Sequence, residues 1–258
     1  MATYLDTIVA AHRAAAARDD RRLEELVEEA GALPAARGFA AALRGRDSLA
    51  VISEIKRRSP SKGDLFPDLD PAVLARTYEA GGAACLSVLT DAEFFGGSVA
   101  DLQAARAACD LPVLRKDFTV DARDVVDARL MGADAVLLIV AALSDAELRA
   151  FHELATAVGL DALVEVHDAG ELDRALAVGA GLIGVNQRDL ATFTVDRELA
   201  AKLRPSMPDD AVAVAESGVR DAVDARSLRA AGYDAVLVGE SLVTSADPAA
   251  AVRELQCS

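Results

Sequence analysis

Short apolar runs recur along most of the chain, separated by longer stretches with a helical repeat. From about residue 48 onward, runs rich in Val, Leu and Ile alternate with Ala-rich stretches whose apolar positions recur at helical spacing. This alternation is typical of repeated strand–helix units. The eight runs that we expect to form strands span residues 49–55, 84–89, 112–115, 135–140, 162–166, 182–185, 212–215 and 235–238.

The number of these units predicts the fold. Eight strand–helix units in about 210 residues fit a (β/α)8 TIM barrel, an α/β fold in which parallel strands close into a ring inside a layer of helices. A doubly wound open sheet usually has fewer strands and a Gly-rich first turn. We therefore predict a single catalytic barrel over residues 46–258.

The first 45 residues have a different pattern, because they contain no strand candidate. Apolar positions there recur at helical spacing, at Leu5, Ile8, Val9 and His12 and then at Leu23, Leu26 and Val27. No Ser/Gly-rich or Pro-rich linker follows this segment. We therefore predict that residues 1–45 form a helical extension packed on the barrel and not an independent domain.

Composition narrows the class of protein. With 258 residues and 52% hydrophobic side chains, the chain can bury a large core. Its formal net charge of −15 argues against nucleic acid as a partner, because polyanions are bound by clustered Lys and Arg. Three cysteines, Cys85, Cys109 and Cys257, fit neither a paired framework nor a metal spacing. With no apolar leader or membrane-length span in the sequence, we expect a soluble, cytoplasmic protein without a metal.

Charged residues end several of the predicted strands. Strand alternation places Glu54 and Lys56 on the same face. Lys116 and Glu216 directly follow other apolar runs, and Glu165 lies near the end of another. In a TIM barrel the carboxyl ends of all strands meet at one mouth, where the active site lies. Any one of these residues alone is as readily explained by a strand-end salt bridge. Five at one mouth favour an active site.

Polar and glycine residues after the last strands indicate an anion site. Ser217-Gly218 follows the seventh predicted strand and Gly239-Glu240 the eighth, where barrels often offer backbone N–H groups to a phosphate. Ordinary tight turns are the alternative explanation of each pair. The stretch 56–63 adds local positive charge in an acidic chain, as expected of a loop that attracts an anion. Asn186 and Arg188 share one face at the end of the sixth strand and offer hydrogen-bond donors.

One segment is specific enough to suggest a family. Residues 54–63 read Glu-Ile-Lys-Arg-Arg-Ser-Pro-Ser-Lys-Gly, which strongly resembles the signature of indole-3-glycerol-phosphate synthases. The resemblance continues in order through Leu-Arg-Lys-Asp-Phe at 114–118, Val-Glu-Val-His at 164–167, Gly-Val-Asn-Gln-Arg-Asp-Leu at 184–190 and Ala-Glu-Ser-Gly at 215–218. It covers essentially the whole predicted barrel.

The resemblance implies a reaction in tryptophan biosynthesis and roles for named residues. The family closes the indole ring of a carboxyphenylamino-deoxyribulose phosphate with loss of carbon dioxide and water, and needs no cofactor. The catalytic set that the resemblance implies is Lys116, Glu165, Lys56 and Glu54. Lys116 resembles the general acid and Glu165 the acid/base group. Lys56 is expected near the substrate carboxylate and as a second candidate for proton transfer, with the acid roles of the two lysines left undivided, and Glu54 holds the charged network. The remaining matches are substrate contacts at Asn186, Arg188 and Glu216, ring walls at Phe95, Phe118 and Leu190, and phosphate-side positions at Ser59, Ser217, Gly218, Gly239 and Glu240.

Two other functions share part of this pattern. Phosphoribosylanthranilate isomerase, another phosphate-binding barrel of the same pathway, would share the last two loops but would not require both lysines together with Glu165. A non-catalytic barrel that binds a sugar phosphate or a partner protein would not require the whole charged set. A small sugar phosphate is the expected partner, whereas the sequence indicates no membrane and no particular protein partner.

Overall fold

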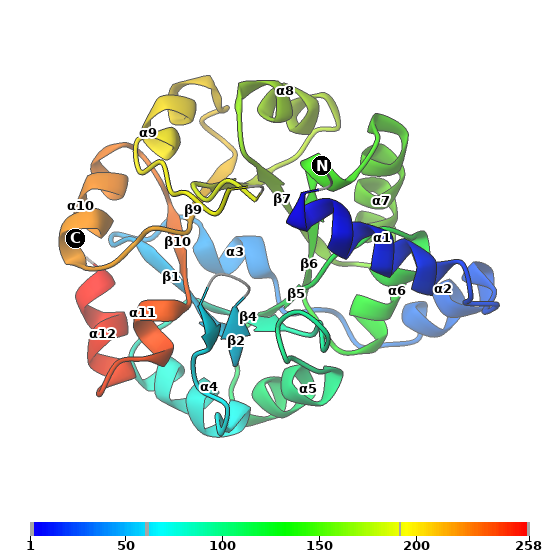
Figure 1. The fold of residues 1–258 in the computed structure, drawn as a ribbon, viewed down its shortest axis with the longest axis horizontal. Coiled ribbons are helices and arrows are strands. Elements are labelled where there is room, and N and C mark those ends of the chain that lie inside the picture. The colour runs from blue at the N-terminus through cyan, green and yellow to red at the C-terminus, as the bar shows by residue number, and fades with distance from the viewer. Residues whose placement is uncertain (1–2, 60–61, 191, 257–258) are drawn as a thin grey trace.

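The computed structural model describes residues 3–59, 62–190 and 192–256, and its centre is a closed barrel of parallel strands (Figure 1). Around the ring the strands follow the order β1-β10-β9-β8-β7-β6-β5-β4, so strands consecutive in this set are neighbours and β10 closes on β1. This ring confirms the TIM barrel predicted from the sequence. The strands of the ring are β1 (Ala50–Ile55), β4 (Cys85–Leu89), β5 (Val113–Lys116), β6 (Ala135–Ile139), β7 (Asp161–Val166), β8 (Leu182–Asn186), β9 (Val212–Glu216) and β10 (Ala235–Val238).

Three strands extend one residue beyond the apolar runs that predicted them. β5 includes Lys116, β8 includes Asn186 and β9 includes Glu216. These polar residues still pair in the sheet, Lys116 with Leu89 of β4 and Asn186 with Glu216. The sheet therefore continues after the hydrophobic pattern has ended, and it fixes the backbone of each of these residues.

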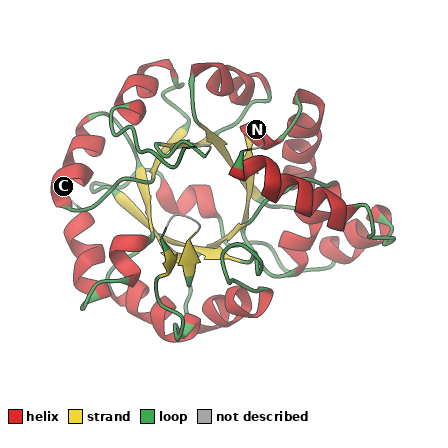
Figure 2. Cartoon of the chain, in the orientation of Figure 1, coloured by secondary structure: helices red, strands yellow, loops and turns green. Residues whose placement is uncertain are grey.

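Helices surround the barrel, as Figure 2 shows. Many begin at an Asp or Ser that caps the first backbone N–H groups, for example Asp70, Ser98 and Asp168. No helix of the described residues is both long and apolar enough to cross a membrane. The helices that follow β1 in the chain are α4 (Pro71–Ala80), α5 (Val99–Ala108), α6 (Ala122–Leu130), α7 (Asp145–Ala157), α8 (Ala169–Ala177), α9 (Leu199–Leu203), α10 (Ala222–Ala230), α11 (Glu240–Val243) and α12 (Pro248–Leu255). Short 3-10 turns lie at Val140–Ala142 and Arg204–Ser206.

Alternation along each strand separates two hydrophobic layers. In β1, Val51 and Ile55 pack outward against the helices, whereas Ala50 and Ile52 belong to the cluster inside the barrel. Glu54 follows the inward positions and therefore points into the barrel at its carboxyl end. A small antiparallel pair, β2 (Arg58–Ser59) and β3 (Gly63–Asp64), follows β1 above the mouth.

Three helices precede the barrel, and each contacts it differently. α3 (Phe39–Leu43) places Phe39 and Leu43, both essentially inaccessible to solvent, in the interior cluster, so this helix fills the amino-terminal end of the barrel. α2 (Leu23–Gly31) packs against α6. α1 (Tyr4–Ala16) reaches across to the mouth, and in Figure 1 it begins at the edge of the ring of strands.

Asp134, directly before β6, ties three segments together. Its side chain is inaccessible to solvent and accepts hydrogen bonds from the backbone N–H of Val113 at 2.9 Å and of Arg37 at 2.7 Å, and it forms an ion pair with Arg106. Asp234 occupies the matching place before β10 but makes one such bond, to the Ala213 N–H at 2.9 Å. Asp134 therefore links the segment before α3 to two neighbouring strands.

We predict that Asp134→Ala destabilises the fold by about 3–5 kcal/mol, because it leaves buried donors without a partner. Asp234→Ala, which removes a single bond at a partly exposed position, is the matched control and should lose about 1 kcal/mol. Urea unfolding of both variants measures the difference. Equal losses in the two variants would show that the buried network adds nothing beyond one hydrogen bond.

Candidate active site

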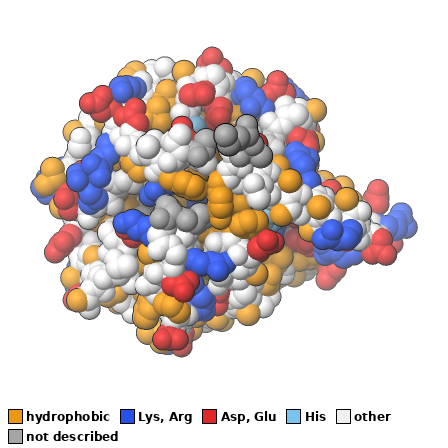
Figure 3. All heavy atoms as spheres, viewed as in Figure 1, with side chains coloured by type: hydrophobic (Ala, Val, Ile, Leu, Met, Phe, Trp, Pro, Cys, Tyr) orange, Lys and Arg blue, Asp and Glu red, His pale blue; other side chains and the backbone are white. Residues whose placement is uncertain are grey.

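A cavity of about 670 Å³ opens at the carboxyl ends of the strands. Figure 3 views this face and shows hydrophobic side chains near its middle with charged ones around them. The fifteen site residues predicted from the sequence all line this cavity: Glu54, Lys56, Ser59, Phe95, Lys116, Phe118, Glu165, Asn186, Arg188, Leu190, Glu216, Ser217, Gly218, Gly239 and Glu240. Pro60 and Ser61 of the family signature lie outside the described residues.

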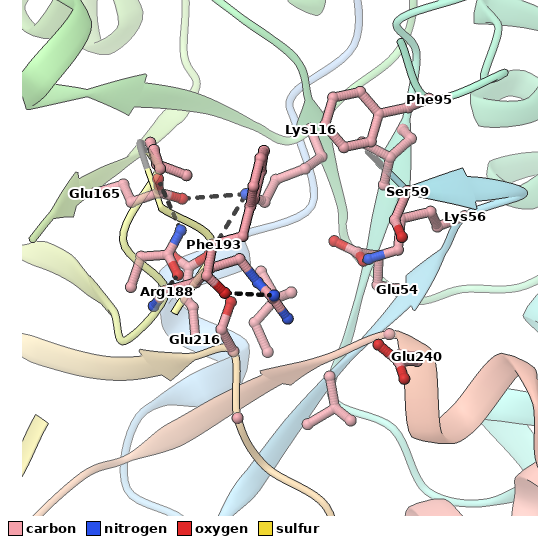
Figure 4. Close-up of a pocket in the computed structure, with 18 of the residues that line it drawn as sticks. Glu54, Lys56, Ser59, Phe95, Lys116, Glu165, Arg188, Phe193, Glu216 and Glu240 are labelled. Carbon is pink, nitrogen blue, oxygen red and sulfur yellow. Dashed lines mark hydrogen bonds and ion pairs between the residues drawn. The ribbon is translucent and has the colours of Figure 1, made fainter. Parts of the chain in front are cut away.

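Lys116 lies between two carboxylates at the centre of the site (Figure 4). Its Nζ is 3.1 Å from Glu165 Oε2 and 3.5 Å from Glu216 Oε2. Burial would lower the pKa of this ammonium, but the charges of Glu165, Glu216 and Glu54 outweigh burial and raise it. Lys116 is therefore a cation in the resting site.

The two carboxylates beside Lys116 have opposite tendencies. Burial favours the neutral form of both, yet the charges of Lys116 and His167 and the Asn186 amide, which donates to Glu165 Oε1 at 3.2 Å, lower the pKa of Glu165. The pKa of Glu216 is raised to about 8, by burial first and then by the neighbouring Glu165. One carboxylate is thus held as an anion while the other binds a proton readily.

A second lysine–carboxylate pair lies across the cavity on β1 and the loop after it. Lys56 forms an ion pair with Glu54, as their shared face on the strand predicted. Gly239, after β10, leaves the space that the Glu54 carboxylate fills, because a Cβ at residue 239 would overlap Glu54 Oε1. Lys62 reaches over the mouth to form an ion pair with Glu240.

The turn after β9 has an unusual backbone. Ser217 and Gly218 adopt positive φ values of 64° and 77° in succession. The Gln187 side chain donates to the Ser217 carbonyl at 2.8 Å, and Arg197 donates to the Gly218 carbonyl at 3.3 Å. A non-glycine residue in this conformation is strained and persists only where its surroundings hold it, so the turn is a built feature of the site.

An aromatic wall faces the cavity from the loops after β4 and β5. The Phe95 and Phe118 rings lie 6.2 Å apart between centroids. On the opposite side, Arg188 follows β8, and its guanidinium donates to the Phe193 carbonyl at 3.3 Å. The cavity thus combines an apolar wall, a charged floor and a rim of backbone turns.

Comparison with known proteins agrees with this arrangement. The model of the family described as indole-3-glycerol phosphate synthase matches residues 5–255. The chain belongs to the indole-3-glycerol phosphate synthase family. Indole-3-glycerol phosphate synthase 2 of Streptomyces coelicolor is 56% identical over 243 residues, which is 94% of this chain and 93% of the relative. Membership confirms the predicted family and, with it, an enzyme class, a carboxy-lyase of tryptophan biosynthesis.

Solved structures with little sequence similarity share the barrel. A thiamine phosphate pyrophosphorylase from Pyrococcus furiosus, 20% identical, superposes with a TM-score of 0.61 over 80% of this chain and 93% of its own. A 3-hexulose-6-phosphate synthase, 18% identical, gives 0.63 over 80% of this chain and 98% of its own. At these identities the likeness shows the fold alone, and the synthase family assignment comes from the sequence matches.

The first turn of α1 forms part of the cavity wall, a contribution that the sequence analysis did not anticipate. Tyr4, Leu5 and Ile8 line the cavity, and the Tyr4 ring contacts Phe193 edge-on, with centroids 5.4 Å apart. The helical spacing of Leu5 and Ile8 predicted a packed face, but it did not reveal what that face covers. In this synthase the helix before the barrel is therefore part of the pocket.

His12 fastens α1 to the loops that carry the aromatic wall. Its Nε2 lies 2.9 Å from Asp91 Oδ2 and 3.9 Å from Asp117 Oδ1. Asp91 also accepts the N–H groups of Phe94 at 2.6 Å and Phe95 at 3.0 Å. Among the described residues, His12, Asp91 and Asp117 form the His/Asp group whose side-chain atoms lie close enough together to bind a metal. The hydrogen bonds account for their orientation, so we interpret the group as a structural latch.

The space beside Glu216 allows a test of how tightly the site is built. Gly184 faces inward from β8, and a Cβ there would overlap Glu216 Oε1. We predict that Gly184→Ala displaces this carboxylate and lowers kcat by about 10²-fold, since small misplacements in an active site cost that much. In the control Gly181→Ala, the new Cβ has its nearest neighbour at 3.9 Å and should leave kcat unchanged. Steady-state kinetics on folded variants measure both, and equal kcat values would contradict the prediction.

The His12 latch makes stability depend on pH. Burial lowers the pKa of His12, but the Asp91 hydrogen bond and the Asp117 charge outweigh burial and raise it. The stabilisation is therefore complete below the unfolded value of about 6.5 and is lost as the pH rises through the higher folded value. We predict that the stability difference between the parent and His12→Gln is largest in acid and shrinks towards alkaline pH.

Unfolding curves across this range test that dependence, with His152→Gln as the control. Burial lowers the pKa of His152, so its effect on stability should have the opposite pH dependence. A His12→Gln deficit that stays constant with pH would exclude a titrating latch.

Proposed function

We propose that the cavity converts 1-(2-carboxyphenylamino)-1-deoxyribulose 5-phosphate to indole-3-glycerol phosphate, the activity of the family to which the chain belongs. The observation that carries this proposal is the position of Lys116, a partly buried ammonium between Glu165 and Glu216 in the pocket that also contains the Lys56–Glu54 pair. Ring closure and dehydration both require proton transfers, and this cluster holds donors and acceptors side by side.

Lys116 is the proposed general acid for ring closure. The aromatic carbon that bears the carboxylate attacks the substrate carbonyl carbon, and the carbonyl oxygen gains a proton as its double bond breaks. A lysine donates only while protonated, and the surrounding carboxylates keep Lys116 in that form. Its positive charge also stabilises the negative charge that develops on the oxygen, which is a separate electrostatic effect.

Glu165 is the proposed acid/base group for the later proton transfers. Loss of carbon dioxide restores aromaticity, and loss of water then requires a proton to leave carbon and another to reach the departing oxygen. An ionised Glu165, 3.1 Å from the lysine that has given up its proton, is suited to accept one and return it. Glu216, whose pKa is raised, can hold a proton beside Glu165 and Lys116 during these transfers.

The other predicted residues suit binding roles. We assign Lys56, oriented by Glu54, to the substrate carboxylate, and Asn186 and Arg188 to polar contacts with the substrate. The anthranilate ring would lie along the apolar wall and the phosphate along the backbone turns after β9 and β10. The proposed sets are Phe95, Phe118 and Leu190 for the ring, and Ser59, Ser217, Gly218, Gly239 and Glu240 for the phosphate side.

We also propose that the enzyme acts in the cytoplasm on a small sugar phosphate and does not bind nucleic acid or membranes. Cys85 and Cys109 are buried free thiols, which suits a reducing compartment. The net charge of −15 disfavours anionic polymers and anionic membrane surfaces. Basic residues that line the cavity, Lys56 and Lys62 among them, offer local positive charge to a small anion.

Indole fluorescence after mixing the protein with the carboxyphenylamino substrate tests the proposed reaction. We expect product from the parent and a fall in kcat of about 10²–10⁴-fold for Lys116→Ala and for Glu165→Gln, because each removes a proton-transfer group. Lys202→Ala on α9, at a largely exposed position with Asp196 and Glu198 as partners, is the matched control and should stay within about twofold.

Two results would contradict the proposal. A folded parent that gives no product would exclude the reaction, and full turnover by Lys116→Ala would remove the lysine from the role of acid. Circular dichroism of each variant separates a chemical loss from a folding loss.

A further inference from the structure

His167 lies behind Glu165, on the side of the carboxylate away from Lys116. It directly follows β7, two residues after Glu165, and its side chain is 14% exposed. Its Nε2 lies 3.4 Å from Glu165 Oε1, and its Nδ1 lies 3.0 Å from Glu171 Oε2 on α8. The resemblance to the synthase family gave this histidine no role.

The two oxygens of Glu165 have different partners. Oε2 faces the Lys116 ammonium at 3.1 Å, whereas Oε1 faces the Asn186 amide at 3.2 Å and the His167 ring at 3.4 Å. The carboxylate is therefore held from both sides, and rotating it would break contacts with three residues. An acid/base group must keep such an orientation to transfer protons to one place.

Glu171 fixes the orientation and protonation of the histidine. One oxygen, Oε2, accepts from both the His167 backbone N–H at 2.8 Å and Nδ1. Glu171 itself lies in the first turn of α8, where its N–H donates to the capping Asp168 at 2.8 Å. A carboxylate at a helix amino terminus is favoured as an anion.

This geometry favours the imidazolium form. With Nδ1 donating to Glu171, a neutral ring would place an unprotonated Nε2 3.4 Å from the Glu165 carboxylate, and two acceptors at that distance repel each other. A proton on Nε2 removes that repulsion. The charged groups that act on the ring are Glu165 from β7 and Glu171 from α8, and together they outweigh burial and raise the pKa of His167 to about 10.

We propose that His167 is a positioning residue for Glu165: it holds that carboxylate as an anion aimed at Lys116, and Glu171 holds His167 in turn. The catalytic consequence rests on the proposed function of Glu165, whereas the electrostatic link between the three side chains does not. His167 is not among the residues that line the cavity and makes no described contact with Lys116, so it acts through Glu165.

Titration of the histidine side chains by NMR tests the link without any turnover. We expect the His167 ring in the parent to stay protonated well above neutral pH, and Glu165→Gln to lower its pKa by about one unit or more. Glu171→Gln should lower it as well. His152 on α7 is the reference and should titrate alike in all three proteins. A His167 pKa that does not respond to Glu165→Gln would overturn the proposal.

Kinetics test the consequence for catalysis. By reciprocity, His167→Gln should raise the pKa of Glu165 by a similar amount, which moves the acid limb of the kcat/KM profile to higher pH by about one unit. At neutral pH, kcat should fall while KM changes little. Glu171→Gln should lower kcat by less, because His167 stays protonated at the pH of the acid limb and loses only its orientation, and adding it to His167→Gln should have no further effect. His152→Gln should leave the profile unchanged.

The two experiments separate the possible failures. A parent that makes no indole product would contradict the proposed function, and the titration would still decide whether His167 and Glu165 are coupled. An active His167→Gln variant with the parental pH profile would overturn the positioning role while leaving the synthase function intact.

Discussion

The charge balance around one buried ammonium governs the mouth of this barrel. Lys116 would be unstable as a cation in a desolvated site without the neighbouring carboxylates, and its charge in turn stabilises the ionised form of Glu165. The alternation of side chains along the strands places these charged groups at the mouth, so the electrostatic balance of the site depends directly on the barrel fold. Substrate binding adds a carboxylate and a phosphate to this balance, which the lysines around the mouth are suited to offset.

Further side chains hold the residues around Lys116 in place. Asn186 and His167 approach Glu165 from behind, and Glu171 at the start of α8 approaches His167. In front of the site, Asp91 binds both His12 and the backbone of the loop that carries Phe95. α8 and α1 thereby each support the site through side-chain contacts, although neither contributes a residue to the proton transfers proposed above.

The sequence predicted the barrel, and the fifteen residues that it indicated for the site all line one cavity, for reasons that differ. The fold followed from repeated apolar runs, and Glu54 and Lys56 followed from strand alternation. The individual roles came only from the resemblance to a family, since residue types alone did not separate a general acid from a strand-end salt bridge. The sequence did not reveal the contribution of Tyr4, Leu5 and Ile8 or the pairing of His12 with Asp91, 79 positions away. Helical spacing shows which face of α1 is buried, but the partner of that face depends on tertiary structure.

Gly184 and Gly239, which lie beside the Glu216 and Glu54 carboxylates, set a limit on how stable an active barrel can be made. In many TIM barrels the interior is filled by layers of branched apolar side chains. Here the layer nearest the mouth holds Gly184 and Gly239, whose missing side chains leave space for Glu216 and Glu54. This layer therefore holds charged side chains in place of packed apolar ones. Stability then depends more on the apolar layers further from the mouth and on α3, which fills the amino-terminal end of the barrel. A variant selected only for heat resistance would be expected to refill this layer with apolar side chains and to lose its activity in doing so.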